Sequence, residues 1–430
     1  MVENRYPTGL RLVSGGLLSF SVLFPHLLGL IGLPLRVSAV GIGLAALAVE
    51  LYLGPWSRRK SAIWLAGAAL WCIGGLGVIE LGARALDNRL FAVNSAHLFV
   101  LLPLFGAVGV LIYRSEGARI YLLTFLVFAS VDAGLAIAEA LLDHSLLGRE
   151  PQFLHSQREG LTRALVGSED VLTLGATLAA TVPLTLKLGS LRFRLMVSAL
   201  LVAGCWASGS RAPAVLCTAV ALTQFVPYVR NLFQRHLWIM FSGATAVLLG
   251  IAYMSVFVWT PWIAGSTGLQ YSANYRGAMY SLVPQILGSH PLGYLLSGPP
   301  LGVWTVGSQL HGAVDIAMSS DSEIVFAVFG LGWIGIALYI AALFTSVGAI
   351  KSDVSVGLAA LSLTVLGLTL ALHSWDGMSP LWYSLIGISA YMVFSRARLR
   401  YQKADRRRPS RPRKLEHRPQ SHYGIQPADR

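Results

Sequence analysis

A single arginine interrupts two apolar runs near the middle of this 430-residue chain. Arg211 follows Ser210 within the segment 207–213, and the apolar runs on either side cover residues 195–206 and 212–227. A charge at the end of a bilayer-length helix is costly unless it faces water, a partner or an anionic ligand. Arginine suits an anion, because its planar guanidinium stays protonated and binds two phosphate oxygens at once. Arg211 is therefore the first candidate for a binding residue.

The composition of the chain indicates that the helices around Arg211 belong to a membrane protein. Hydrophobic residues make up 55% of the chain and charged residues only 12%, which excludes an ordinary soluble enzyme. Many apolar segments are long enough to cross a hydrocarbon core of ~30 Å. The sequence therefore predicts an all-α polytopic membrane protein with about 12 transmembrane helices. The predicted spans are residues 10–31, 35–55, 61–81, 94–113, 120–142, 171–188, 194–208, 212–229, 237–258, 324–346, 355–372 and 380–395.

The seventh and eighth of these spans are short, so the segment 208–213 between them is a candidate break inside the membrane profile. The first apolar run lacks a small-residue cleavage site and is expected to be an anchor, not a cleaved signal peptide.

The basic residues orient the predicted bundle. Most of the 33 Lys and Arg fall in alternate connections and in the tail, which by the positive-inside rule places both termini in the cytoplasm. The net charge of +13 is thus mainly a topology signal. We expect a transmembrane domain over 1–395 and a basic, disordered cytoplasmic tail over 396–430 that lies against anionic membrane lipids. No aromatic interleaving accompanies the tail, so no nucleic acid is expected as a partner.

Two outer connections are long enough to carry function. The second covers residues 259–323, is rich in aromatic residues and proline, and has Arg276 as its one basic residue. A lateral helix is expected within it over 277–287. The first covers residues 143–170, and its arginines are Arg149, Arg158 and Arg163.

Several other polar residues fall within or near the predicted spans. Intramembrane acids are rare and usually pair internally, which we expect of Glu50, Glu80, Asp132 and Glu139. All three cysteines fall within predicted spans, so no disulfide framework is expected. No zinc-type spacing and no nucleotide-binding loop occurs, so the sequence predicts neither a metal nor a cofactor.

In order and spacing, three segments resemble motifs of the O-antigen polymerase and ligase family. Residues 208–212 are similar to its "GSRG" element. Tyr275 and Arg276, followed by 290–294, resemble its arginine, short helix and "hPlfGvG" turn. Residues 321–335 are similar to its entry into the next span. The resemblance covers about residues 187–350.

The resemblance implies a GT-C-like membrane glycosyltransferase with a large extracytoplasmic loop between its ninth and tenth helices. Members use undecaprenyl-diphosphate-linked glycans as donors, without a nucleotide sugar and generally without a metal. The resemblance thus implies a bacterial cytoplasmic membrane protein with an outward-facing site and lipid-linked glycans as donor and acceptor. Ligases carry a histidine where this chain has 319–322, Ser-Ser-Asp-Ser, which favours a polysaccharide polymerase. The involvement of a chain-length regulator stays open.

Catalysis on such a donor needs positive charge for the diphosphate and a base for the attacking sugar hydroxyl. Arg211 and Arg276 are the candidates for the donor diphosphate, with Ser210 beside Arg211. The acceptor diphosphate is assigned to the arginines of the first outer loop. The candidate bases are Asp321, then His311, and Glu323. Direct displacement by the hydroxyl would invert the anomeric configuration.

Other interpretations of these residues stay open. Arg211 could anchor a helix at the membrane interface, Arg276 could pair with Asp315 or Asp321, and Asp321 could cap the next helix. An O-antigen ligase is the alternative enzyme. A solute transporter is the alternative of another class, which should show an internal repeat with broken helices at mid-membrane.

Overall fold

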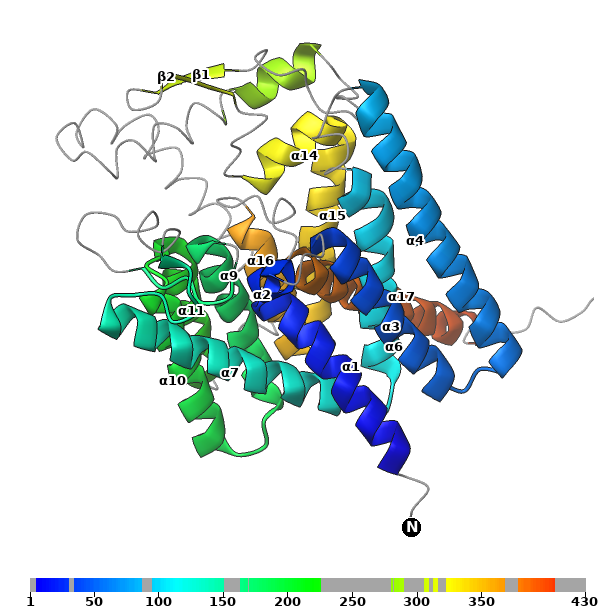
Figure 1. The fold of residues 1–430 in the computed structure, drawn as a ribbon. Helices are drawn as coiled ribbons and strands as arrows, with labels where there is room; N and C mark the ends of the chain where they lie inside the picture. The colour runs from blue at the N-terminus through cyan, green and yellow to red at the C-terminus, as the bar shows by residue number, and fades with distance from the viewer. Residues whose placement is uncertain are drawn as a thin grey trace, which may run out of the picture. The chain divides into compact units, whose positions relative to one another are not determined.

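The computed structural model of the chain describes eleven stretches, and the fold reported below is confined to them (Figure 1). These stretches are residues 5–30, 35–86, 95–150, 163–168, 170–225, 280, 282–289, 305–308, 312–315, 322–367 and 378–406.

Helices make up nearly all of the described chain. In the first half they are α1 (Arg5–Leu23), α2 (Pro25–Leu30), α3 (Leu35–Leu53), α4 (Arg58–Leu86), the π-helix η1 (His97–Leu101), α6 (Leu102–Arg114) and α7 (Ala118–Leu142). In the second half they are α9 (Val171–Thr181), the 3-10 helix η2 (Val182–Lys187), α10 (Leu191–Ala207), α11 (Arg211–Phe225), α14 (Glu323–Leu331), α15 (Trp333–Ile350), α16 (Val354–Leu366) and α17 (Ser379–Arg406).

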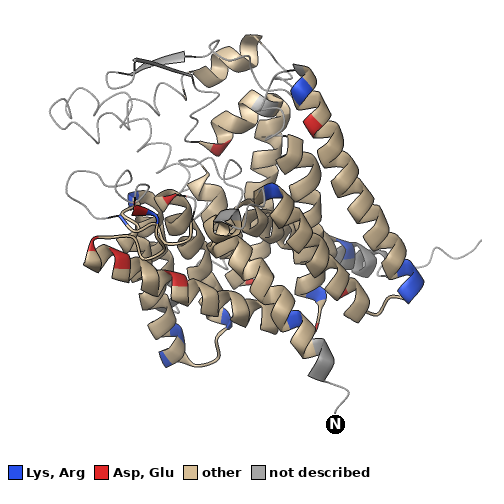
Figure 2. Cartoon of the chain, in the orientation of Figure 1, with Lys and Arg blue, Asp and Glu red and all other residues tan. Residues whose placement is uncertain are grey.

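Five of the described helices are long and apolar enough to cross a membrane. They are Leu35–Leu53, Arg58–Ala85, His97–Arg114, Ala118–Leu142 and Trp333–Ile350. Figure 2 shows that charged residues lie mostly toward helix ends, with long uncharged stretches between them. Large apolar side chains such as Trp64, Leu70 and Leu81 of α4 are exposed. Exposed apolar faces of this kind need a lipid solvent, so the chain is a helical membrane protein.

The described helices lie where the sequence predicts spans, with two differences. The predicted span 324–346 is two helices, because Gly332 adopts φ +56° and turns the chain between α14 and α15 (Figure 1). The predicted span 10–31 is also divided, between α1 and α2. The predicted span 237–258 lies outside the described residues.

Two further details depart from the sequence expectations. A two-stranded antiparallel hairpin, β1 (Thr305–Ser308) with β2 (Gly312–Asp315), lies within the second outer connection. The tail is helical at its start, since α17 continues to Arg406 through residues with good helix propensity. Residues 394–430 form a compact unit separate from 1–393.

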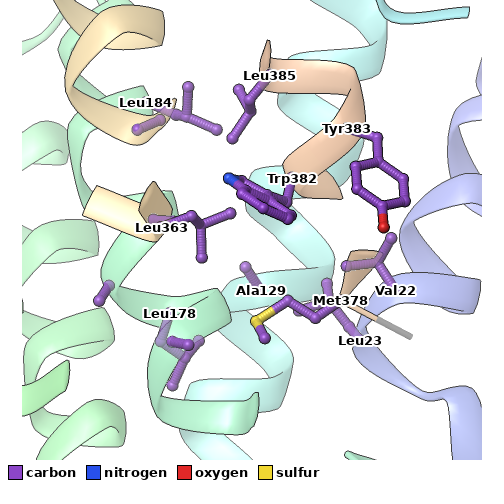
Figure 3. Packing of buried hydrophobic residues seen from close by; sticks show 14 of the residues in the cluster. Val22, Leu23, Ala129, Leu178, Leu184, Leu363, Met378, Trp382, Tyr383 and Leu385 are labelled. Carbon is purple, nitrogen blue, oxygen red and sulfur yellow. The ribbon is translucent and has the colours of Figure 1, made fainter. Parts of the chain in front are cut away.

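Close packing of small residues joins the helices. α7 packs along both α1 and α10, and a Cβ built on Gly204 of α10 would lie 2.6 Å from Cβ of Ala133 on α7. A Cβ on Gly387 of α17 would lie 2.6 Å from Cα of Gly106 on α6. Larger side chains fill the core between these contacts, with Trp382 of α17 near Leu363 of α16 (Figure 3). Small residues let membrane helices approach closely, which is the common packing mode there.

Candidate functional site

The segment predicted as a break between two short spans is a tight turn. α10 ends at Ala207, and Gly209 takes φ +64°, a left-handed conformation that favours glycine. The Ser208 hydroxyl donates to the Cys205 carbonyl at 2.7 Å and accepts from the Ser210 backbone N–H at 3.3 Å. The turn thus reverses the chain in three residues before α11 begins.

Ser210 ties this turn to a neighbouring helix. Its hydroxyl is buried and donates to the Val171 carbonyl at the first residue of α9, at 2.9 Å. Gly175, one turn further along α9, makes the approach possible, since a Cβ there would lie 2.9 Å from the Ser208 hydroxyl. The Ser210 hydroxyl therefore fixes the turn against α9.

Arg211 is the first residue of α11 and is exposed. Within the described part of the chain its guanidinium makes neither a hydrogen bond nor an ion pair. The N-terminus of a helix carries partial positive charge from its unpaired backbone N–H groups. A charged guanidinium at such an end repels its own helix slightly, and it is well placed to meet an anion.

The first outer loop closes onto the same turn. The Ala164 backbone N–H donates to the Ala207 carbonyl at 2.9 Å. Next to it, the Arg163 side chain crosses Gly209, where a built Cβ would lie 2.6 Å from Arg163 Cγ. Any residue larger than glycine at 209 would collide with this arginine. Arg163 and Arg211 therefore approach the turn from two segments that are far apart in the sequence.

Glu139, near the end of α7, holds the first outer loop in place. Its side chain is fully buried, and its carboxylate accepts from three backbone N–H groups: Leu146 at 3.0 Å, Leu165 at 2.8 Å and Val166 at 2.8 Å. The Ser145 hydroxyl donates to the same carboxylate at 3.4 Å. One acid thus joins the start and the end of the loop. The sequence marked Glu139 as unusual but did not indicate that its partners would be backbone amides.

Arg149 is buried within this loop. Its Nη1 donates to the carbonyl of Ser168 and, at 3.5 Å, to that of Val166. Its backbone N–H donates to the Ser145 hydroxyl at 3.1 Å. A guanidinium bonded to backbone carbonyls stabilises the loop, so the Arg149 side chain holds the end of the loop at Val166 and Ser168.

A second group of polar residues surrounds the start of α14. Glu323 is buried, and its backbone N–H donates to the Gly367 carbonyl at the end of α16, at 2.7 Å. Ser322, the N-cap of α14, is also buried, and its hydroxyl lies 3.1 Å from the Tyr280 hydroxyl. The acid therefore lies within packed protein and not in an open loop.

Part of the second outer connection folds against α14. Residues 282–289 are helical, as the sequence predicted for the region around 277–287. Ile286 and Leu287 pack with Val325, Val328 and Phe329 of α14 in one buried cluster. This helical segment covers α14 next to Glu323.

The described part of the chain links the two groups through α16. This helix packs against α9, η2 and α11, and the Gly367 carbonyl at its end accepts from the Glu323 N–H. Four of the predicted site residues lie outside the described residues: Arg158, Arg276, His311 and Asp321.

Among the described residues, no group of three or more His, Cys, Asp or Glu side chains is placed to hold a metal ion. No protein-family model matches the chain, and no curated protein and no solved structure matches it.

Proposed function

We propose that this protein polymerises undecaprenyl-diphosphate-linked oligosaccharide repeats into O-antigen or exopolysaccharide at the outer face of the bacterial cytoplasmic membrane. The proposal includes twelve membrane spans, both termini in the cytoplasm and an outward-facing site. Its main support is the convergence of Arg163 and Arg211 on the Ser208–Ser210 turn. Two separate segments bring positive charge to one helix N-terminus, as a diphosphate requires.

The proposed chemistry is a single displacement. The acceptor hydroxyl attacks the anomeric carbon of the donor sugar, and the bond from that carbon to the lipid diphosphate breaks. Arg211 takes up the charge that develops on the departing diphosphate, and Arg276 is proposed to assist it. Electrostatic stabilisation of this kind is commonly a large part of catalysis. Arg163 and Arg158 are proposed to hold the acceptor diphosphate.

The base is proposed to come from the start of α14. Asp321 takes the proton of the attacking hydroxyl, and His311 is the second candidate. Glu323 is buried two residues further on, where the bonds of Glu323 and Ser322 to Gly367 and Tyr280 fix the chain. A carboxylate next to packed apolar residues becomes a better base than one in water.

The test is the length of glycan chains in a deletion strain complemented with single variants, with membrane levels checked for each. Arg211→Ala should lower polymer by roughly 100-fold, the usual effect of losing one charge-stabilising donor. Arg211→Lys should restore only part of it, because lysine cannot bind two oxygens in one plane. The matched control is Arg84→Ala, since Arg84 is exposed and pairs with exposed Glu80 on its own helix.

The alternatives give different products. Short lipid-linked repeats in the deletion strain support a polymerase. Long lipid-linked polymer that is never transferred would indicate a ligase. Normal surface glycan in the deletion strain would exclude both the polymerase and the ligase function and would favour a transporter.

A further inference from the structure

The described chain contains a cavity of about 800 Å³ that none of the candidate site residues lines. Its walls come from α1, α6, α7, η2, α10, α16 and α17, and include Leu18, Phe105 and Phe125. Leu184 and Leu385 also line it, and both belong to the packed core beside Trp382 (Figure 3). Cavities of this size, mainly apolar with a few polar groups, are typical of sites for small molecules.

The charged residues of the cavity all lie at or next to helix ends. Only three of its lining residues are charged: Arg119 at the start of α7, Lys187 at the end of η2 and Asp353 just before α16. Arg119 and Lys187 are exposed, whereas Asp353 is buried. By the positive-inside rule applied to the sequence, these helix ends are expected to face the cytoplasm. The cavity therefore has an apolar interior and a polar mouth.

The mouth of the cavity has two cationic side chains, Arg119 and Lys187, and one anionic side chain, Asp353. The Asp353 carboxylate pairs with the Lys187 ammonium and accepts from the Ser355 hydroxyl at 2.7 Å and its N–H at 3.1 Å. Its charge is thus already neutralised by a cation and by a helix N-terminus. Within the described residues, Arg119 has neither a hydrogen bond nor an ion pair. The Lys187 side chain is 43% exposed, which leaves N–H donors available.

We propose that the cavity binds one anionic phospholipid, with an acyl chain in the apolar interior and the phosphate at Arg119 and Lys187. A guanidinium binds two phosphate oxygens in one plane, and the ammonium adds a third contact. Basic residues at this membrane face attract anionic lipids, whereas a soluble apolar ligand would lack the phosphate contact. The proposal depends on the membrane location of the chain and not on its action on glycans.

The test uses the full chain purified in a neutral detergent. Photoreactive phosphatidylglycerol with a diazirine on its acyl chain is cross-linked, and the modified peptides are identified by mass spectrometry. Modification should concentrate on the cavity-lining segments of α1, α7 and α17. Phosphatidylcholine should compete poorly, and inorganic phosphate should not compete at all.

A matched pair of variants tests the mouth. Arg119→Gln should weaken phosphatidylglycerol binding by about tenfold, the effect of losing a charge-assisted hydrogen bond. Arg192→Gln removes the same charge at the same end of the bundle, from an exposed residue that does not line the cavity, and should leave binding unchanged. Equal binding of both lipids, competition by inorganic phosphate, or labelling confined to the exposed face of α4 would each overturn the proposal. The positions of the cross-linked peptides test the proposal even if the Arg119→Gln variant fails to fold.

Discussion

Two acids on the same helix show opposite solutions to burial in a membrane protein. Glu139 and Asp132 of α7 are both completely buried and lie seven residues apart, about two turns along one face. Glu139 accepts from three backbone N–H groups and a hydroxyl. Neither oxygen of Asp132 makes a hydrogen bond within the described residues. The first acid therefore organises structure, whereas burial of the second without hydrogen bonds lowers stability.

The largest effect is expected from Glu139→Ala. The change leaves three buried backbone N–H groups without an acceptor, which should cost on the order of 4–5 kcal/mol of unfolding free energy. Unfolding in mixed micelles, together with protease cleavage of the first outer loop, would measure this. Glu80→Ala is the control, because Glu80 is exposed and pairs with exposed Arg84 on its own helix. Equal stability of the two variants would contradict the proposed anchoring role.

Glu50 is a buried acid with an ion-pair partner, so removal of that partner by mutation tests the comparison between paired and unpaired acids. Arg11 Nε lies 3.0 Å from Glu50 Oε1, and the Glu50 side chain is 2% exposed. Arg11→Met should leave Glu50 buried without its counter-ion, with Tyr121 as its remaining neighbour, and lower stability by about 3 kcal/mol. The double variant Arg11→Met, Glu50→Met should recover most of that loss, since an apolar pair has no unpaired buried charge. A double variant as unstable as the single would show that packing, and not charge, causes the effect.

The close contact between α7 and α10 lies next to Asp132, and a second pair of variants tests how tightly the two helices pack there. Gly204→Ala places a methyl group 2.6 Å from Cβ of Ala133, the neighbour of Asp132, and should cost about 2 kcal/mol by forcing the helices apart. Gly134→Ala is the matched control on α7, because nothing lies within 4 Å of its Cβ position. The control should be neutral or slightly stabilising. Similar melting temperatures for both variants would mean that the helices are not held at Gly204.

The smallest expected effect has the opposite sign. Asp132→Leu replaces an acid without hydrogen bonds by an apolar side chain of similar size and should raise the unfolding free energy by about 1–2 kcal/mol. Lower stability would reveal a partner of Asp132 outside the described residues. Higher stability combined with loss of polymer would assign Asp132 a functional role.

Sequence reasoning predicted the helices better than the contacts. Long apolar runs identify membrane helices because no other structure satisfies their backbone in lipid. The break at Gly332 was missed, since glycine is common in membrane helices and its φ cannot be read from composition.

The candidate site was predictable only where a residue stands out locally. Arg211 did, as a lone charge between apolar runs. Arg149 was predicted as a ligand because it is one of three arginines of the first outer loop, yet its guanidinium bonds to loop carbonyls whose positions depend on tertiary structure. The role of Glu139 was missed because its partners are backbone amides, which every sequence contains.

The short length of α16 determines how deep in the membrane its C-terminal end lies. Its 13 residues rise only about 20 Å, roughly 10 Å less than the hydrocarbon core. If Asp353 and Lys187 mark one membrane surface, Gly367 and the start of α14 lie well below the opposite one. Backbone at that depth is tolerated only where protein or a water-filled recess surrounds it. Protein provides that surrounding at the start of α14, because Ser322 and Glu323 are both buried. Any substrate of the proposed polymerase that used Glu323 would therefore have to react beneath the plane of the headgroups.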